Sequence, residues 1–301
     1  MNLNRLAYFA AVVDAGSFTR AAERLGVTKA VVSHQVAQLE RDLQTSLLVR
    51  TTRRVSPTEA GRMLHARCLV ILREAEDAFD ELAQAVGAPT GLLRLTAPHD
   101  YGAAVVIPVV TAFTALYPAC RVDQMLSDQT MDLGAGGIDV AIRVGWLEDS
   151  SLQARKIGSF RQLVVGGPDF ADRIASARDP EDLAAFPFVA NMALRDPLLW
   201  TFSRGTRDRR SVRLQASMAI DTTLGVLAAV RTGGGISVLP DFLVAEDLAS
   251  GRLSAALPDW RLSSGGIYTV YPAARFRPLK VTVFVEMLTA AEQRRASNTS
   301  I

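Results

Sequence analysis

The stretch from Ser17 to Leu43 constrains the fold of this chain more than any other segment. Its sequence, SFTRAAERLGVTKAVVSHQVAQLERDL, predicts a helix, a tight turn and a second helix. Ser17 and Thr28 precede the two helices, and a hydroxyl at such a position accepts a hydrogen bond from a free N–H of the first turn. Gly26 stands between the helices, where a residue that tolerates positive φ ends a helix. A helix-turn-helix is therefore expected.

The faces of the two helices carry different side chains. The first helix has a small apolar face, made by Ala21, Ala22 and Leu25. In the second helix, apolar residues recur at helical spacing and are expected to be buried together: Val32, Val36, Leu39 and Leu43. The opposite face is short, polar and basic: Lys29, Ala30, Ser33, His34, Ala37 and Arg41. That face suits a helix that enters a DNA major groove and reads base edges, although two ordinary surface helices would share the spacing.

Two further elements flank these helices. Residues 3–15 place apolar side chains on one helical stripe: Leu3, Leu6, Phe9, Ala10 and Val13. Residues 47–55 predict a short hairpin, with two brief apolar runs around a polar and basic tip. Three arginines in this hairpin are candidates for phosphate or minor-groove contact, and solvation of the turn is the alternative: Arg50, Arg53 and Arg54.

A long helix is predicted to start at Thr58, its N-cap, and to run to about Val86. Its apolar residues lie close to heptad spacing, and charged residues fall off that stripe: Leu64, Cys68, Ile71, Ala75, Ala78, Leu82 and Ala85. One helix cannot bury such a seam alone, so the pattern favours pairing with a second copy of the chain. Packing against the chain's own C-terminal part is the alternative.

Charge is distributed unevenly along the chain. The whole chain has a formal charge of +2. Residues 1–58 contain eight Lys and Arg against four acidic residues, whereas residues 59–88 contain three basic and six acidic residues. A basic N-terminal part followed by a nearly neutral body fits a module that approaches phosphates, joined to a part with another task.

The sequence gives no indication of export or membrane insertion. No stretch is expected to span a bilayer, and the N-terminus MNLNRLAYFAAVV lacks a small-residue cleavage site, so it is interpreted as a folded helix. Cys68 and Cys120 have no metal-type spacing. These features predict a cytoplasmic protein with no membrane partner, and they favour burial over redox sensing for both cysteines.

Beyond the hinge-like segment GAPTG at 87–91, short apolar strands alternate with helices. This pattern is typical of an α/β domain with a mainly parallel sheet. Strands are predicted at 92–96, 121–127, 139–144, 162–166, 188–191, 212–220, 235–239 and 266–271, with a further piece before residue 281. Helices are predicted at 102–117, 131–134, 180–184, 222–232, 240–249 and 279–295.

Residues spread over the first sixty positions form a signature: Leu6, Phe9, Gly16-Ser17-Phe18, Ala21-Ala22, Leu25, Val32-Ser33, Leu39-Glu40, Leu43, Leu47, Arg50, Thr58 and Ala60-Gly61. Later motifs follow in order: GLLRLTAP at 91–98, Pro108, Phe113, Tyr117-Pro118, LSD at 126–128, GIDVAIRVG at 137–145, GGGISVLP at 233–240 and PLKVTVFVEML at 278–288. Together they resemble the LysR-type transcriptional regulators over essentially the whole chain. The chain departs from that pattern at Lys29-Ala30, where the family often has Gln-Pro, and at Leu48, where it often has Phe; the first departure bears on base preference.

The resemblance implies an α+α/β fold. A winged helix-turn-helix with a long linker helix would precede a two-lobed α/β effector domain similar to periplasmic binding proteins. The implied boundaries are 1–58 for the DNA-binding domain, 59–88 for the linker helix and 89–301 for the effector-binding domain. Lobe one would take 91–161 and 267–301 and lobe two 162–266, with crossings at 159–162 and 263–266.

The function that this resemblance implies is a bacterial transcriptional regulator whose promoter binding and DNA bending respond to a small-molecule effector. The implied partners are double-stranded promoter DNA, the effector, RNA polymerase, and further copies of the chain. The copies would form a dimer through residues 59–86 and a tetramer through the effector domains. No cofactor or metal is expected. The expected DNA-binding residues are Ser17, Thr19, Arg20, Thr28, Lys29, Ala30, Ser33, His34, Gln38, Arg50, Arg53 and Arg54.

The effector is expected where ligands of open α/β sheets bind, past the carboxyl ends of strands and beside helix N-termini. Residues 96–101, 127–128, 143–146 and 221–223 meet that description. The expected effector-binding residues are Thr96, Pro98, His99, Asp100, Tyr101, Ser127, Asp128, Arg143, Gly145, Trp146, Asn191, Trp200, Asp221 and Thr222. Their hydroxyls, ring faces and one arginine suit a small organic acid or aromatic compound, with capping or packing as the alternative for each residue. Arg143 has its own alternative, an ion pair with Asp139 or Asp128.

An enzyme is the main alternative function. The three histidines, His34, His65 and His99, are far apart, and the sequence has neither a G-x-S-x-G elbow nor a P-loop. The glycines at 134–137 do not make a dinucleotide fingerprint. A solute-binding protein for transport would need an export signal, and a purely structural DNA-packing protein would not need a two-lobed sensor. A non-enzymatic regulator is therefore expected.

Overall fold

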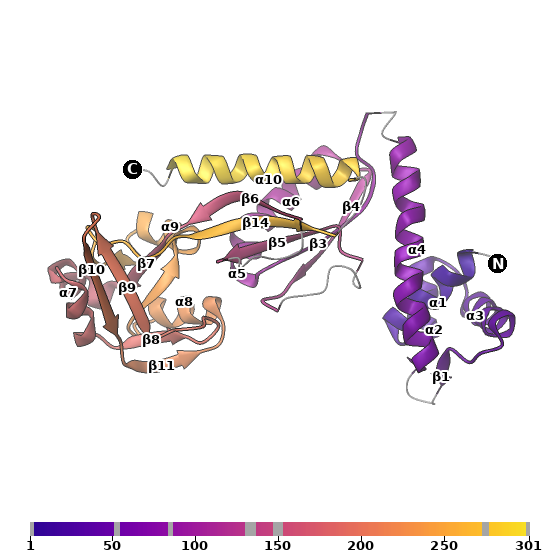
Figure 1. Cartoon of the computed structure of the whole chain (residues 1–301), viewed down its shortest axis with the longest axis horizontal. Coiled ribbons are helices and arrows are strands. Elements are labelled where there is room, and N and C mark those ends of the chain that lie inside the picture. Colours follow the sequence, from indigo (N-terminus) through magenta and orange to yellow (C-terminus); the bar gives the residue numbers. More distant parts are fainter. Residues whose placement is uncertain are drawn as a thin grey trace. The chain divides into compact units, whose positions relative to one another are not determined.

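The computed structural model describes residues 3–50, 55–83, 87–129, 137–146, 153–272 and 277–298. The chain forms two compact units (Figure 1). The first unit contains helices α1 to α4 and the hairpin β1–β2. The second unit contains two five-stranded sheets with their helices. Each unit is described by itself below.

The first unit begins with three helices: α1 (Leu3–Ala15), α2 (Phe18–Leu25) and α3 (Lys29–Leu43). The predicted caps are confirmed. Ser17 Oγ accepts from the Arg20 N–H at 3.5 Å, and Thr28 Oγ1 accepts from the Val31 N–H at 3.4 Å. Gly26 ends α2 in the left-handed region, at φ 64°. Residues 17–43 therefore fold as the predicted helix-turn-helix.

The core of the first unit confirms most of the predicted apolar positions. Val32 and Val36 are fully buried on α3, together with Phe9 of α1 and Ala21 of α2. The prediction was wrong for Leu43, which is 42% exposed. Leu43 is the last residue of α3, and the chain turns there through Gln44 at φ 50°. Leu25, the last residue of α2, is likewise exposed at a helix end.

The predicted hairpin follows. Strands β1 (Leu48–Arg50) and β2 (Val55–Pro57) pair antiparallel, with Val49 opposite Ser56, and the tip at 51–54 lies outside the described residues. Thr58 then caps the long helix α4 (Glu59–Ala83), since its Oγ1 accepts from the Gly61 N–H at 3.0 Å. The predicted last turn, at 84–86, is outside the described residues.

The apolar stripe of α4 is divided between two environments. Leu64 and Leu72 pack partly buried against the core of the first unit, and Cys68 is fully buried in it. Burial raises the pKa of the Cys68 thiol to about 11, so this cysteine is a protonated apolar residue at neutral pH. Ile71 is 37% exposed. The first half of the stripe thus joins α4 to its own DNA-binding helices, which the heptad interpretation did not predict.

Lobe one, in the second unit, is built on a sheet with strand order β4-β3-β5-β14-β6. The strands are β3 (Gly91–Ala97), β4 (Cys120–Leu126), β5 (Val140–Gly145), β6 (Gln153–Phe160) and β14 (Gly265–Tyr271). Strands β3 and β5 are parallel, whereas β14 runs antiparallel to β5 and β6. The helices of this lobe are α5 (His99–Tyr101), η2 (Gly102–Val106), α6 (Ile107–Leu116) and α10 (Leu279–Asn298).

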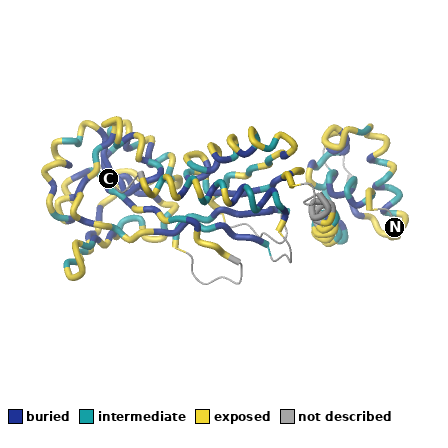
Figure 2. Tube along the Cα trace, turned by 90° about the horizontal axis from the view of Figure 1, so that it is seen from above, coloured by how far each residue is buried: buried dark blue, intermediate teal, exposed yellow. Residues whose placement is uncertain are grey.

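Lobe two is built on a sheet with strand order β11-β8-β12-β7-β13. The strands are β7 (Gln162–Gly166), β8 (Phe188–Asn191), β11 (Ala216–Ile220), β12 (Ile236–Pro240) and β13 (Ser254–Ala255). A separate hairpin pairs β9 (Leu199–Arg204) with β10 (Asp208–Arg213). The helices are η3 (Pro168–Phe170), α7 (Ala171–Ser176), η4 (Pro180–Ala185), α8 (Thr223–Arg231) and α9 (Asp241–Ala249). Buried residues concentrate along the inner strands of both sheets, whereas the edge strands β4 and β11 are mostly exposed or half-buried (Figure 2).

Several strand and helix predictions need correction. Both sheets are mixed rather than mainly parallel, because β14 and β7 each run antiparallel to a neighbour. The predicted strand 212–220 is two strands, with β10 ending at Arg213 and β11 starting at Ala216. Strands β6, β9 and β13 and helix α7 were not predicted, because charged and small residues mask their alternation. The predicted helix at 131–134 lies outside the described residues.

One helical segment of lobe one is apolar enough to reach the limit for a membrane span, contrary to the expectation that no stretch does. His99–Leu116 has a mean hydropathy of 1.3 over 18 residues. Tyr101 and Phe113, however, are fully buried in the lobe-one core, and Phe113 packs on Phe284 of α10 with ring centroids 5.8 Å apart. The segment is a helix of the α/β unit, with exposed apolar side chains at Ile107 and Leu116.

A buried carboxylate joins α8 to α9 in lobe two. Asp247 of α9 is fully buried; it accepts from Arg231 Nη2 at 2.7 Å and from Arg252 Nε at 2.6 Å. Burial alone would raise the pKa of this carboxyl, but the hydrogen bonds and charges of the two arginines outweigh burial and lower it.

Asp247→Asn is expected to destabilise the second unit by about 1–2 kcal/mol at pH 7. This is less than for a fully buried pair, because both guanidinium groups are half-exposed and screened by solvent. A lowered folded-state pKa contributes stability above the unfolded value of about 3.9 and loses it as pH falls. The difference between parent and variant in urea denaturation should therefore be constant above about pH 5 and shrink below it. A constant difference down to pH 4 or below would contradict this account.

Candidate DNA-binding face and effector cavity

The first half of α3 presents the side chains predicted to reach DNA. Lys29, Ala30 and His34 are exposed, and Ser33 is half-buried beside them. On α2, Thr19 and Arg20 are exposed as well. Ser17 and Thr28 have a structural role as N-caps, and a cap can still offer its hydroxyl to a phosphate.

Two parts of the predicted DNA face have a different status. Gln38 is engaged within α3, because its Oε1 accepts from Arg41 Nη2 at 2.5 Å and its Nε2 donates to Asp42 at 3.3 Å. These bonds orient the Gln38 amide, which keeps a second N–H and a second acceptor lone pair for a contact with DNA. Arg53 and Arg54 lie outside the described residues, as does the side chain of Arg50.

A cavity of about 250 Å³ lies between the two lobes, where the strand ends of both sheets meet. Its lining includes Gln162, the first residue of β7, and Pro240, the last residue of β12. Eight of the predicted effector-binding residues line it: Pro98, Asp100, Ser127, Asp128, Arg143, Gly145, Trp146 and Asn191. The structure thus brings together residues from positions 98 to 191 of the chain.

The other predicted effector residues are placed elsewhere. Thr96 is fully buried and does not line the cavity, and its hydroxyl has no hydrogen-bond partner among the described residues. Tyr101 belongs to the lobe-one core, where its hydroxyl donates to Glu292 Oε1 at 2.6 Å. His99 is half-exposed and holds Asp128, to which its backbone N–H donates at 3.0 Å.

The predicted effector-binding residues Asp221, Thr222 and Trp200 of lobe two do not line the cavity. Thr222 caps α8 by accepting from the Gly225 N–H at 3.3 Å, whereas its neighbour Thr223 lines the cavity. Asp221 is exposed outside the cavity. Trp200 lines a neighbouring groove. The helix start at 221–223 was therefore the correct region, but α8 begins one residue later than predicted.

Thr223 closes a hydrogen-bonded bridge between the lobes. Its hydroxyl accepts from Asn191 Nδ2 at 3.1 Å and hydrogen-bonds the side chain of Asp100. Asp100 also accepts from the Tyr101 N–H at 2.6 Å. Because Asp100 belongs to lobe one and Thr223 and Asn191 to lobe two, this bridge connects the lobes in the wall of the cavity.

The two acidic residues of the cavity influence each other. Burial is the main cause that raises the pKa of Asp100, and the nearby Asp128 charge raises it further, against the lowering effect of the Tyr101 and Thr223 hydrogen bonds. His99 Nδ1 lies 3.2 Å from Asp128. This side of the cavity is therefore an acceptor surface that favours a proton donor.

Arg143, the arginine of the cavity, has no charged partner among the described residues. Arg143 is half-buried on β5, and among the described residues its side chain forms no ion pair or hydrogen bond. Asp139, one of its two suggested partners, accepts instead from the Arg94 N–H at 2.7 Å. Burial without a partner lowers the pKa of the Arg143 guanidinium.

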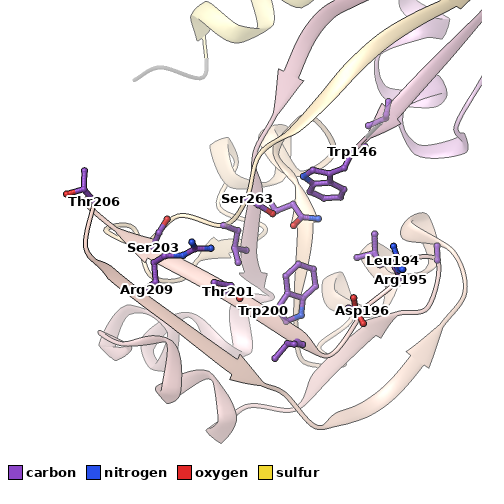
Figure 3. A pocket seen from close by; sticks show the side chains of 17 residues that line it. Trp146, Leu194, Arg195, Asp196, Trp200, Thr201, Ser203, Thr206, Arg209 and Ser263 are labelled. Atoms are coloured by element: carbon purple, nitrogen blue, oxygen red, sulfur yellow. The ribbon is translucent and has the colours of Figure 1, made fainter. Parts of the chain in front are cut away.

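A groove of about 910 Å³ continues from the cavity onto lobe two. The cavity and the groove share Val144, Gly145, Trp146, Gln162, Ala193 and Leu194. Figure 3 shows the indoles of Trp146 and Trp200 on two sides of the groove, with Arg195 and Asp196 on the loop after β8. Trp146 Nε1 donates to the Ser264 carbonyl at 3.0 Å, and Trp200 Nε1 donates to the Pro197 carbonyl at 3.0 Å, so both rings are fixed.

Part of the lining was not predicted from the sequence. Phe160 and Phe242 supply apolar walls, and Gln162 is a buried polar residue at the crossing from β6 to β7. The sequence offers no signal for Gln162, because its burial beside the lobe crossing is not visible in the sequence. Among the described residues, no group of three or more His, Cys, Asp or Glu is arranged to hold a metal ion.

Comparison with known proteins gives the same assignment for both units. Residues 3–62 match the bacterial regulatory helix-turn-helix of the lysR family, and residues 87–293 match the LysR substrate binding domain. PtxR, an HTH-type transcriptional regulator of Pseudomonas aeruginosa, is 41% identical over 288 residues, which cover 96% of this chain and 92% of PtxR. AaeR, an HTH-type transcriptional activator of Escherichia coli, is 30% identical over 289 residues, covering 95% and 93%.

Solved structures agree with these relatives. The full-length virulence activator AphB of Vibrio cholerae is similar with a TM-score of 0.61 at 27% identity, over 96% of this chain and 99% of that one. CrgA, a LysR-type transcriptional regulator from Neisseria meningitidis, has a TM-score of 0.61 at 28% identity, over 96% and 98%. The relatives are transcriptional regulators, not enzymes. This chain therefore belongs to the LysR family of bacterial transcriptional regulators, with an N-terminal DNA-binding helix-turn-helix and a C-terminal effector-binding domain.

Proposed function

We propose that this regulator binds promoter DNA through α3 and the β1–β2 hairpin, and that a small organic acid or aromatic compound in the inter-lobe cavity controls that binding. The observation that carries the proposal is the cavity itself. It places the half-buried Arg143 beside the rings of Trp146 and Phe160, between the two lobes. A ligand that prefers the closed arrangement of the lobes would shift the protein between two existing states and so change its DNA bending.

Self-association is part of the same proposal. On α4, Met63 and Val70 are 70% and 44% exposed and one heptad apart, on helix surface that the core of the first unit leaves free. Such a seam supports a dimer through residues 59–86, which would hold two reading helices about 34–36 Å apart. Contacts between effector domains would pair dimers into a tetramer, and Leu116 at the end of α6 is an exposed apolar residue available for such a contact.

The setting of this function follows from its partners. Promoter DNA places the protein in the bacterial cytoplasm, and RNA polymerase is the partner through which a bent promoter changes transcription. No cofactor is required for these steps. The domain boundaries proposed are 1–58, 59–88 and 89–301.

The test uses the full chain and DNA sites selected from a random pool by binding to it. Fluorescence anisotropy then compares a selected site with a scrambled one over a range of salt concentrations. Removing a base contact with Ser33→Ala or His34→Ala should reduce discrimination between the two sites by about tenfold or more, the equivalent of 1–3 kcal/mol. Arg53→Ala should weaken both sites alike and lower the salt slope by about one.

Arg213→Ala, an exposed arginine on β10, serves as the control and should change neither quantity. If Ser33→Ala and His34→Ala both discriminate as well as the parent, α3 is not the reading helix. If the parent binds no selected site at low salt, the proposed function itself is wrong.

A further inference from the structure

The inter-lobe cavity contains an unusual set of charges. Three charged residues line it among those described: Asp100, Asp128 and Arg143. The acids lie close enough for the Asp128 charge to affect Asp100, whereas Arg143 lies beyond ion-pair distance of either. A half-buried cation without a partner is unfavourable, and two neighbouring carboxylates are unfavourable as well. The unpaired arginine and the two neighbouring carboxylates line the same cavity.

We propose, building on the function above, that this cavity selects a small carboxylate that also carries a hydroxyl or ammonium group. The carboxylate pairs with Arg143, and the hydroxyl or ammonium group donates to Asp100 and Asp128. A guanidinium binds a carboxylate with two parallel hydrogen bonds. Each wall acid has acceptor capacity beyond the bonds it already accepts from Tyr101, Thr223 and His99.

Other ligand classes fit these walls less well. A second carboxylate on the ligand would face Asp100 and Asp128, which repel it. A neutral aromatic compound would pack on Phe160 and Phe242 but would leave Arg143 unpaired. A simple amine would satisfy the acids but would be repelled by Arg143. Only a molecule with both groups satisfies the cation and the acids together.

A donor group on the ligand would also affect the contact between the two lobes. Asp100 belongs to lobe one and already bonds Thr223 of lobe two, while Arg143 stands on the lobe-one strand β5. A hydroxyl or ammonium group that reaches Asp100 therefore joins the hydrogen-bonded bridge that connects the lobes. A plain carboxylate would bind Arg143 without joining that bridge. The donor group, more than the carboxylate, would then stabilise the closed arrangement.

The test measures binding of matched probes to the full-length chain by thermal shift and calorimetry. One set has a phenyl body: phenylacetate, mandelate, phenylglycine and mandelamide. The other has a straight six-carbon body: hexanoate, 2-hydroxyhexanoate, norleucine and 2-hydroxyhexanamide. In at least one set, the 2-hydroxy or 2-amino acid should bind at least tenfold more tightly than both the plain acid and the amide.

Variants separate the two halves of the site. Arg143→Gln should weaken every carboxylate probe at least tenfold, whereas Arg213→Gln, outside the cavity, should weaken none. Asp128→Asn should weaken the amino acid at least tenfold but the hydroxy acid less than threefold, because an amide oxygen still accepts from a hydroxyl. Without ligand, Arg143→Gln should not lower the unfolding temperature, since no ion pair is lost; a structural arginine would.

Each contrary result overturns a defined part of the inference. Equal binding of acid and amide removes the role of Arg143, and equal binding of plain and substituted acids removes the role of the acidic pair. If no probe of either set binds to protein that still binds its selected DNA site, the inference is wrong while the regulator function stands.

Discussion

Arg295→Met is expected to lower the free energy of unfolding of the second unit by about 3–5 kcal/mol, the usual cost of removing one partner from a buried ion pair. Arg295 of α10 donates to Glu292 at 2.9 Å, to Asp241 at 3.2 Å and to the Ser159 carbonyl at 2.6 Å. Glu292 is 1% exposed and Asp241 is 5% exposed. Methionine fills a similar volume without a charge, so the Glu292 carboxylate would lose Arg295, and Asp241 would keep the half-exposed Arg161 at 3.5 Å.

This cluster also joins the two lobes. Asp241 starts α9, directly after the lobe-two strand β12, whereas Arg295 and Glu292 are on the lobe-one helix α10. Tyr101 donates to Glu292, and its ring packs on Phe242 with centroids 5.1 Å apart. Desolvation and the neighbouring Glu292 charge raise the pKa of the Tyr101 phenol, so it is a protonated donor at neutral pH. The cluster is therefore a fixed support beside the cavity.

Urea unfolding followed by tryptophan fluorescence measures the effect, because Trp146, Trp200 and Trp260 all lie in the second unit. Arg213→Met on the surface of β10 is the matched control and should change stability by less than about 0.5 kcal/mol. Arg295→Met combined with Glu292→Leu should recover part of the loss, since an apolar pair often replaces a buried ion pair at little cost. Recovery is partial because the Tyr101 hydroxyl then lacks its acceptor. A single variant as stable as the parent would contradict this account.

What the sequence could predict differs between the two units for a physical reason. In the first unit the decisive interactions are local: Ser17 bonds Arg20, Thr28 bonds Val31, and Gly26 ends a helix by its own φ. Local interactions of this kind can be read from spacing. Leu43 was predicted incorrectly because its burial depends on whether the helices packed against α3 extend over its last turn, which spacing does not reveal.

The cavity shows the opposite case. Strand ends and helix starts located Asp100, Arg143 and Asn191 in the correct region, because ligand sites in α/β sheets follow from topology. Topology does not decide which neighbour faces inward. Thr96 points into the fold, and Thr223 rather than Thr222 reaches the cavity, since the start of α8 fixes the rotation of that helix.

The Arg295 cluster was beyond prediction for the same reason. Its members come from positions 101, 159, 241, 292 and 295, and the longest hydrogen-bonded separation is 191 residues. A charged residue in an amphipathic helix such as α10 is normally solvated, so the pattern around Glu292 predicts exposure. Only the packed lobes turn it into a buried acid.

Gly61→Ala is expected to destabilise the first unit by about 3 kcal/mol and to abolish DNA binding, although alanine is the better helix former by about 1 kcal/mol. Gly61 lies in the first turn of α4, and a Cβ there would stand 2.1 Å from the Leu47 carbonyl oxygen. That oxygen accepts from the Thr58 N–H at 2.9 Å, so it is fixed backbone between α3 and the hairpin. Relief of the clash would move the hairpin or α4, and both position the DNA-binding face.

The two units allow the effect of Gly61→Ala to be located. Circular dichroism at 222 nm reports helices of both units, whereas all three tryptophans lie in the second. The variant should therefore lose part of its helical signal at lower temperature than the parent, while its tryptophan transition stays unchanged. Glu23→Ala, at an exposed position of α2 in the same unit, should alter neither transition. Coincident early loss of both signals would mean that the clash is transmitted to the effector unit, and unchanged DNA affinity would show that the contact between Gly61 and Leu47 does not position the hairpin.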